Sequence, residues 1–159
     1  MISNLFIGLL TTAVCVAIQC LIMARMLRTL YRFEQKGRLQ STMLGISWVL
    51  IVITLIILTG NLLQIALWAG VFMIVDEFQA FSIAFYHSVV NFSTLGYGDM
   101  VMSESRRLLG ALEALNGVLM IGLSTGALFA VLNGLLQRAW AERESHTHTG
   151  GRTRTGGAR

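Results

Sequence analysis

The stretch Ser93-Thr94-Leu95-Gly96-Tyr97-Gly98-Asp99 lies between two long apolar segments, and its two glycines alternate with larger residues. Glycine adopts positive φ values without a steric penalty. Residues that alternate with glycine can therefore aim successive carbonyl oxygens the same way, which a helix or a strand cannot do. Such a row of carbonyls can replace the hydration shell of a cation. The alternative interpretation is a glycine-rich turn between two helices, because Gly-Tyr-Gly alone occurs in many surface turns.

The composition indicates a membrane protein. Of the 159 residues, 55% are hydrophobic and 13% are charged, and the mean hydropathy is +0.68. These values exclude a disordered chain and are unusual for a soluble domain. Cys15 and Cys20 have no disulfide or metal-site spacing and are expected to be structural thiols. No nucleophile–base pair, metal motif or phosphate loop is present, so enzyme activity is not expected.

The chain divides into four regions. We assign residues 1–25 to a first transmembrane helix, 26–41 to a basic interfacial loop or helix, 42–137 to a pore domain and 138–159 to a basic, flexible tail. The first apolar run, residues 5–23, is long enough to span a bilayer. It lacks a preceding basic residue and a small-residue cleavage site, so a retained helix is favoured over a signal peptide.

The pore domain has its own internal order. An outer helix is expected at residues 43–75, a pore helix at 78–92, the filter at 93–99 and an inner helix at 108–137. The pore helix is too short to span and too apolar for a free loop, so we expect a re-entrant helix buried in protein. Its C-terminal end would point the negative end of the helix dipole toward a cation. The predicted fold class is an all-α membrane protein.

This arrangement resembles the two-helix pore module of potassium channels. Thr94-Leu95-Gly96-Tyr97-Gly98-Asp99 is similar to their usual filter, Thr-Val-Gly-Tyr-Gly-Asp, with leucine in place of valine. The closest likeness is to a small bacterial ion-channel family whose inner helix resembles Arg107-Leu108-Leu109-Gly110-Ala111-Leu112-Glu113-Ala114. The first helix lies outside this common module.

The resemblance implies specific roles. Potassium would bind the carbonyl oxygens of four residues and the hydroxyl of the first: Thr94, Leu95, Gly96 and Tyr97. Five further residues would support the filter: Ser93, Gly98, Asp99, Tyr86 and His87. Gly122 would be a gating hinge, or a glycine that permits close helix packing. No cofactor is expected other than potassium ions in the filter.

Two departures from the family pattern affect the filter support. Tyr86 and His87 stand where related pore helices carry tryptophans that brace the filter. His87 would be structural, would bond to the filter scaffold or would confer pH sensitivity. Val90 replaces a glutamate that pairs with the filter aspartate in some members, so Asp99 needs another partner or water.

The charge distribution predicts the orientation. Five basic residues and one acid lie between residues 25 and 38, and five basic residues and two acids lie in the tail. The segment 76–113 has two basic and five acidic residues. The positive-inside rule therefore places the loop and tail in the cytoplasm, and the filter and N-terminus outside. The net charge of +4 is thus explained without nucleic acid.

The basic residues Arg25, Arg28 and Arg32 are expected to contact anionic lipids. A voltage sensor is the alternative, but its arginines would lie inside a span. One filter per chain predicts a homotetramer. The expected location is a plasma membrane, and more specifically a bacterial inner membrane. The expected function is a potassium-selective channel; the alternative is a weakly selective monovalent cation channel. A potassium-transporter subunit is disfavoured, because such transporters resemble four linked repeats on one long chain.

Overall fold

The structure, a computed structural model, describes residues 1–35 and 43–152 of the chain. These residues form four helices and no strand: α1 (Ile2–Gln35), α2 (Met43–Ile74), α3 (Phe81–Phe92) and α4 (Arg107–Arg152). Three of them contain segments long and apolar enough to cross a membrane, namely Ile2–Phe33, Leu44–Ile74 and Arg107–Gln137. The predicted all-α fold with three candidate spans is therefore confirmed.

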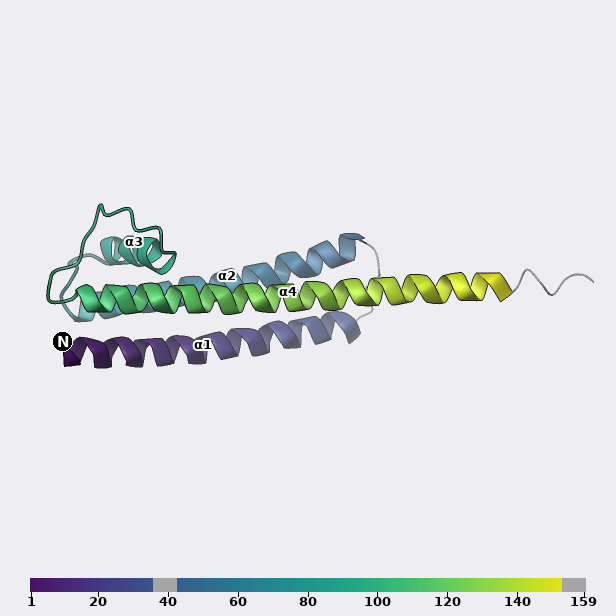
Figure 1. The fold of residues 1–159 in the computed structure, drawn as a ribbon, viewed down its shortest axis with the longest axis horizontal. Coiled ribbons are helices and arrows are strands. Elements are labelled where there is room, and N and C mark those ends of the chain that lie inside the picture. The colour runs from purple at the N-terminus through teal and green to yellow at the C-terminus, as the bar shows by residue number, and fades with distance from the viewer. Residues whose placement is uncertain (36–42, 153–159) are drawn as a thin grey trace, which may run out of the picture.

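The three long helices lie lengthwise beside one another, and α3 lies beside them at one end (Figure 1). α1 contacts α2 and α4, and α3 also contacts both α2 and α4. The start of α1 and the loops around α3 share this end of the bundle, which we call the filter end. α4 projects beyond α1 and α2 at the opposite end.

Two helices run further than the sequence predicted. α1 continues through residue 25, where a boundary between the first span and a separate basic element was expected, and ends at Gln35. The residues from 26 to 35 include no glycine or proline and favour helix, so nothing interrupts it. The remainder of the predicted loop, residues 36–42, lies outside the described residues. α4 likewise extends to Arg152, where a flexible tail was expected. Residues 139–144 are rich in alanine and glutamate, which favour helix and account for the first part of this extension.

The turn between α2 and α3 sets where the pore helix begins. Asp76 has φ +56, the left-handed conformation that commonly closes a helix. The amide of Glu77 donates to the Phe72 carbonyl at 3.0 Å, and that of Asp76 donates to the Met73 carbonyl at 3.1 Å. This pair of bonds is a Schellman cap. α3 consequently starts at Phe81, three residues after the predicted start at residue 78.

The interior consists of two apolar clusters, and a set of polar side chains forms hydrogen bonds between the helices. The cluster toward the filter end includes Trp68 and Phe72, and the other includes Met26 and Ile53. These hydrogen bonds form a chain through three helices: Gln64 donates to Gln19 at 2.9 Å, and Gln19 donates to Ser124 at 3.0 Å. In the membrane interior such bonds satisfy groups that water cannot reach, so they fix α1 against α2 and α4.

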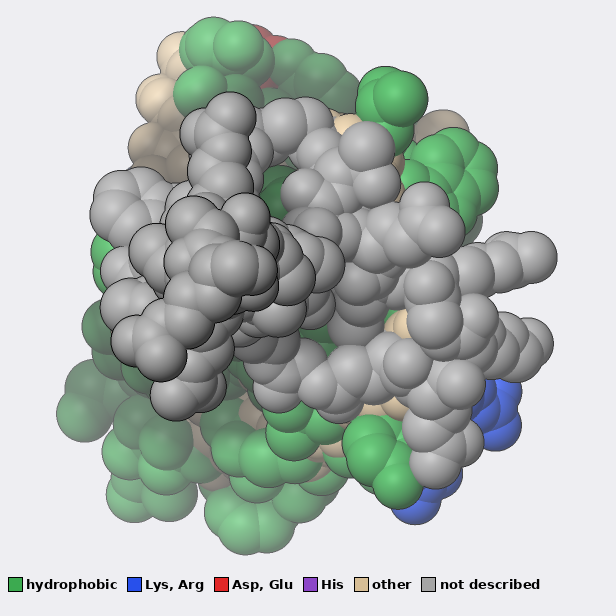
Figure 2. All heavy atoms as spheres, turned by 90° about the vertical axis from the view of Figure 1, so that its right-hand side faces the viewer, with side chains coloured by type: hydrophobic (Ala, Val, Ile, Leu, Met, Phe, Trp, Pro, Cys, Tyr) green, Lys and Arg blue, Asp and Glu red, His purple; other side chains and the backbone are tan. Residues whose placement is uncertain are grey.

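The outer surface is apolar, as expected for helices in lipid. Seen from the end opposite the filter, hydrophobic side chains make up most of the visible periphery, and basic side chains gather in one part of it (Figure 2). Large exposed apolar residues occur on all three long helices, for example Phe6, Leu58 and Phe129. Lipid or neighbouring subunits would cover these surfaces.

Candidate ion-conduction site

The filter begins where α3 ends. Ser93 caps the helix: its amide donates to the Val89 carbonyl at 3.1 Å, and its hydroxyl donates to the same oxygen at 2.6 Å. The Thr94 amide then donates to the Asn91 carbonyl at 2.9 Å. These bonds turn the chain sharply back along its own helix, so the filter starts directly beside the C-terminal end of α3.

The backbone of the filter alternates in conformation. Three residues have positive φ values: Thr94 at +60, Gly96 at +58 and Gly98 at +76. Leu95 and Tyr97, which lie between them, do not. This alternation is the conformation that the Gly-x-Gly spacing predicts, and it begins two residues before Gly96, at Thr94. A threonine in this conformation is strained by about 1–3 kcal/mol and persists only where its surroundings hold it.

The hydrogen bonds of the filter amides determine where its first carbonyls point. The amides of Leu95 and Gly96 both turn toward the Val90 carbonyl, at 3.0 and 3.5 Å. In a planar trans peptide the carbonyl of one residue points opposite to the amide of the next. The carbonyls of Thr94 and Leu95 therefore point away from α3. Within the described chain, no hydrogen-bond donor reaches the carbonyl oxygens of residues 94–97.

The filter side chains have few neighbours in a single chain. The exposed fraction is 56% for Leu95 and 67% for Tyr97, although both side chains are large and hydrophobic. Gly96 and Gly98 have open space where a Cβ would stand, so their positive φ, and not crowding within the chain, is what requires glycine.

Asp99 finds a partner on α3. The Tyr86 hydroxyl donates to Asp99 Oδ2 at 2.8 Å, and Asp99 Oδ1 accepts the Met100 amide at 3.1 Å. The hydrogen bond to Asp99 raises the pKa of the Tyr86 phenol above its ordinary value of 10.0. The structure thus brings these two predicted support residues together.

His87 faces away from the filter. Its ring packs against Phe72 at 5.6 Å and Phe78 at 5.0 Å between ring centroids, on the side of α2. Within the described chain its Nε2 has no hydrogen-bond partner, so no bond to the filter scaffold is present. Burial lowers the pKa of His87 below 6.5, and the charges of Glu77 and Asp99 act in the opposite direction. The structural role considered for this residue fits its position best.

A buried carboxyl group behind the filter was not assigned a partner from the sequence. Glu113 on α4 is fully buried, and its Oε2 accepts a 2.7 Å hydrogen bond from Asn91 Nδ2 on α3. Asn91 also donates to the Gly110 carbonyl at 2.7 Å. The signal was present in the sequence, because a lone acid in an apolar span marks a functional or paired position. Its partner could not be found by spacing, since it lies 22 residues away.

Glycines on α4 have different environments. A Cβ at Gly117 would overlap the carbonyl oxygen of Phe92, so this glycine allows α4 to approach the end of the pore helix. Gly122, the predicted hinge, has no atom of this chain within 4 Å of a Cβ position, and α4 runs straight through it. Of these two glycines, Gly117 is therefore the one that permits close packing within the chain. The hinge role of Gly122 stays a prediction.

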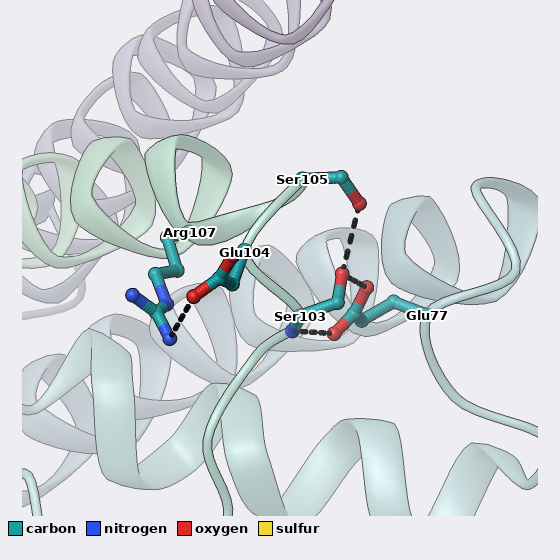
Figure 3. A network of polar contacts seen from close by, with 5 residues as sticks. All are labelled: Glu77, Ser103, Glu104, Ser105 and Arg107. Atoms are coloured by element: carbon teal, nitrogen blue, oxygen red, sulfur yellow. Dashed lines mark hydrogen bonds and ion pairs between the residues drawn. The ribbon is translucent and has the colours of Figure 1, made fainter.

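The loops around the filter are fixed to each other. Glu77, after α2, accepts hydrogen bonds from the amide of Ser103 at 2.6 Å and from its hydroxyl at 2.8 Å (Figure 3). Figure 3 also shows the ion pair of Glu104 with Arg107, at 3.5 Å. Arg106 donates to Asn4 at 2.8 Å, which places the start of α1 at the filter end.

These features are typical of a pore element of the ion-channel class: a short, half-buried helix, a loop of alternating φ whose first two carbonyls point away from that helix, and two flanking helices long enough to span a membrane. Comparison with protein families agrees, because residues 61–133 match the family model described as an ion channel. This part of the chain is therefore similar to an ion channel domain, and the resemblance to pore modules is confirmed. No curated protein and no solved structure matches the chain.

Proposed function

We propose that the chain forms a potassium-selective channel in which the carbonyl oxygens of Thr94, Leu95, Gly96 and Tyr97 hold the ion. The observation that carries this proposal is the alternation of φ from Thr94 to Gly98, together with amides that turn toward α3. The carbonyls of Thr94 and Leu95 point away from α3, and no donor of the described chain reaches the carbonyl oxygens of residues 94–97. Unpaired carbonyl oxygens in a row are the ligands that a dehydrated potassium ion requires. Ser93, Gly98, Asp99 and Tyr86 support this backbone.

The functional unit is a homotetramer. One filter cannot encircle an ion, and four copies can. The exposed Leu95 and Tyr97 side chains support this assembly, since neighbouring subunits would bury them. Charge asymmetry further supports an orientation with the filter and N-terminus outside and α4 ending in the cytoplasm, in a plasma membrane and most simply a bacterial inner membrane.

The test is ion flux from liposomes that contain the purified chain. Flux of K⁺ and Rb⁺ with exclusion of Na⁺ is expected, and the mass of the assembly in mild detergent should equal four chains. Comparable Na⁺ flux would favour the weakly selective cation channel instead. A stable monomer or dimer in both detergent and lipid would contradict the pore proposal.

A further inference from the structure

A groove of about 660 Å³ runs between α1 and α2. It extends from Ile18 to Arg25 on α1 and from Leu63 to Val52 on α2. Its floor is closed at Gly60, where the side chain of Ile22 occupies the space that a Cβ would need. The groove is therefore formed by close helix contact on one side and stays open on the other.

Among the residues that line the groove, only one has a free polar group that a ligand could bind. All lining residues are apolar or small except Thr59 and Arg25. The Thr59 hydroxyl donates to the Leu55 carbonyl of its own helix at 2.8 Å, so its donor is already used. Arg25 is exposed and has no ion-pair partner among the described residues. One end of an apolar groove thus carries an unpaired positive charge.

The depth of Arg25 matches a lipid headgroup. The apolar run of α1 starts at Leu5, next to the filter-end contact of Asn4 with Arg106. A hydrocarbon core of about 30 Å corresponds to about 20 helical residues. Its far boundary consequently lies near Arg25, and the groove occupies the half of the membrane opposite the filter.

A second groove provides an internal comparison. It lies between α1 and α4, measures about 330 Å³ and is lined by apolar residues and Gly134 alone. No charged residue lines this second groove, so its lining offers nothing to select a headgroup. Of these two grooves, the one between α1 and α2 combines an apolar channel with a cation at headgroup depth.

We infer that the groove between α1 and α2 binds an anionic phospholipid, with one acyl chain along the groove and the phosphate at Arg25. Arg28 and Arg32 follow Arg25 by three and seven residues, so they share its face of α1 and extend the positive surface toward the headgroups. This proposal assigns the expected contact of these arginines with anionic lipid to one defined groove. It rests on membrane insertion and not on potassium selectivity, so it can fail while the channel proposal holds.

Native mass spectrometry of the full chain tests the site with phosphatidylglycerol and phosphatidylcholine of identical acyl chains. The parent should bind phosphatidylglycerol about fivefold more tightly, the effect of one basic residue near an anionic surface. Arg25→Gln should remove that preference, while Arg107→Gln, at the filter end, should keep it. Thr59→Trp should fill the groove and weaken binding of both lipids, whereas Leu58→Trp, outside the lining, should not.

A measurement on the unaltered chain covers variants that fail to fold. Phosphatidylglycerol with a diazirine on one acyl chain should label residues 18–25 and 52–63 in preference to the groove between α1 and α4. Equal labelling of the two grooves would overturn the assignment. So would an unchanged headgroup preference in Arg25→Gln, or crosslinks between subunits across the groove in place of lipid.

Discussion

The Tyr86 hydroxyl donates a 2.8 Å hydrogen bond to Asp99, joining α3 to the last residue of the filter. Related pore helices were expected to use tryptophan here. Phenol and indole each provide a single donor on an aromatic ring, so tyrosine can perform the same task. It also gives Asp99 the partner that Val90 cannot provide.

Replacing Tyr86 with phenylalanine should destabilise the conducting filter. Phe keeps the ring and removes only the donor, so Asp99 loses its bond to α3 and the outer end of the filter is freer to rearrange. We expect current that decays several-fold faster, with tetramer assembly unchanged, in planar-bilayer recordings. Tyr31→Phe, an exposed tyrosine on α1, is the matched control and should behave like the parent.

The hydrogen bond from Tyr86 to Asp99 also predicts that the current is lost at alkaline pH. Because it raises the pKa of Tyr86 above 10.0, its stabilising effect is fully present below pH 10 and is lost as pH rises through the raised value. This alkaline loss of current should be missing in Tyr86→Phe. A parent and variant with the same pH dependence would argue against a role for the bond.

His87 should limit the stability of the folded protein at acidic pH. Burial lowers the pKa of His87, so the unfolded chain binds a proton more readily than the folded one below pH 6.5. The contribution of His87 to stability should be constant from neutral pH upward, and stability should fall as pH drops below 6.5 toward the lowered value. Thermal unfolding of the purified protein measures this. His87→Phe should suit the Phe72 and Phe78 surroundings and abolish the acidic decline; retention of the decline would assign it to other groups.

Glu113 should hold the pore helix against α4 through Asn91. Glu113→Ala leaves a donor of Asn91 unpaired in a buried site, which costs about 1–3 kcal/mol. Glu113→Gln keeps an acceptor oxygen and should lose much less. Glu104→Ala, an exposed acid, is the control. Denaturation of the tetramer gives these values, and a double-mutant cycle with Asn91→Ala should show strong coupling. Additive effects would mean that the two side chains act independently.

Two glycines on α4 should differ sharply. Gly117→Ala places a Cβ against the Phe92 carbonyl, so α4 must shift and the assembly should be lost or strongly destabilised. Gly122→Ala has open space within the chain and should assemble normally. If Gly122 is a hinge, its alanine variant will alter opening while leaving unfolding unchanged. Equal damage from both substitutions to the folded assembly would refute the distinction.

The sequence predicted the features that depend on local pattern. Apolar length located the three spans, and the Gly96 and Gly98 spacing predicted the alternating backbone. The end of α2 was predicted within one residue, but the start of α3 was less predictable, because the Schellman cap at Asp76 uses a residue other than glycine. The extent of α4 was missed for a related reason: polarity was taken to end a helix that its alanine and glutamate residues favour.

Long-range pairs could not be predicted from spacing. The partners of Asp99 and Glu113 lie 13 and 22 residues away on another helix, and Gln19 is 45 residues from Gln64. Such contacts depend on how the helices pack. The positive φ of Thr94 also escaped prediction, since threonine does not favour that conformation and only the turn at the end of α3 holds it there.

The reversal potential with K⁺ on one side of a planar bilayer and Na⁺ on the other tests the filter most directly. Each tenfold preference for K⁺ moves it by about 59 mV at 25 °C for a singly charged ion. The parent should show a large shift toward K⁺. Leu95→Val should match it, because only the carbonyl of residue 95 faces the ion. Thr94→Ala should conduct with a smaller shift, and Gly96→Ala should not conduct although it assembles. A parent reversal potential near zero, or a Gly96→Ala channel as selective as the parent, would contradict the assignment of this loop as a potassium filter.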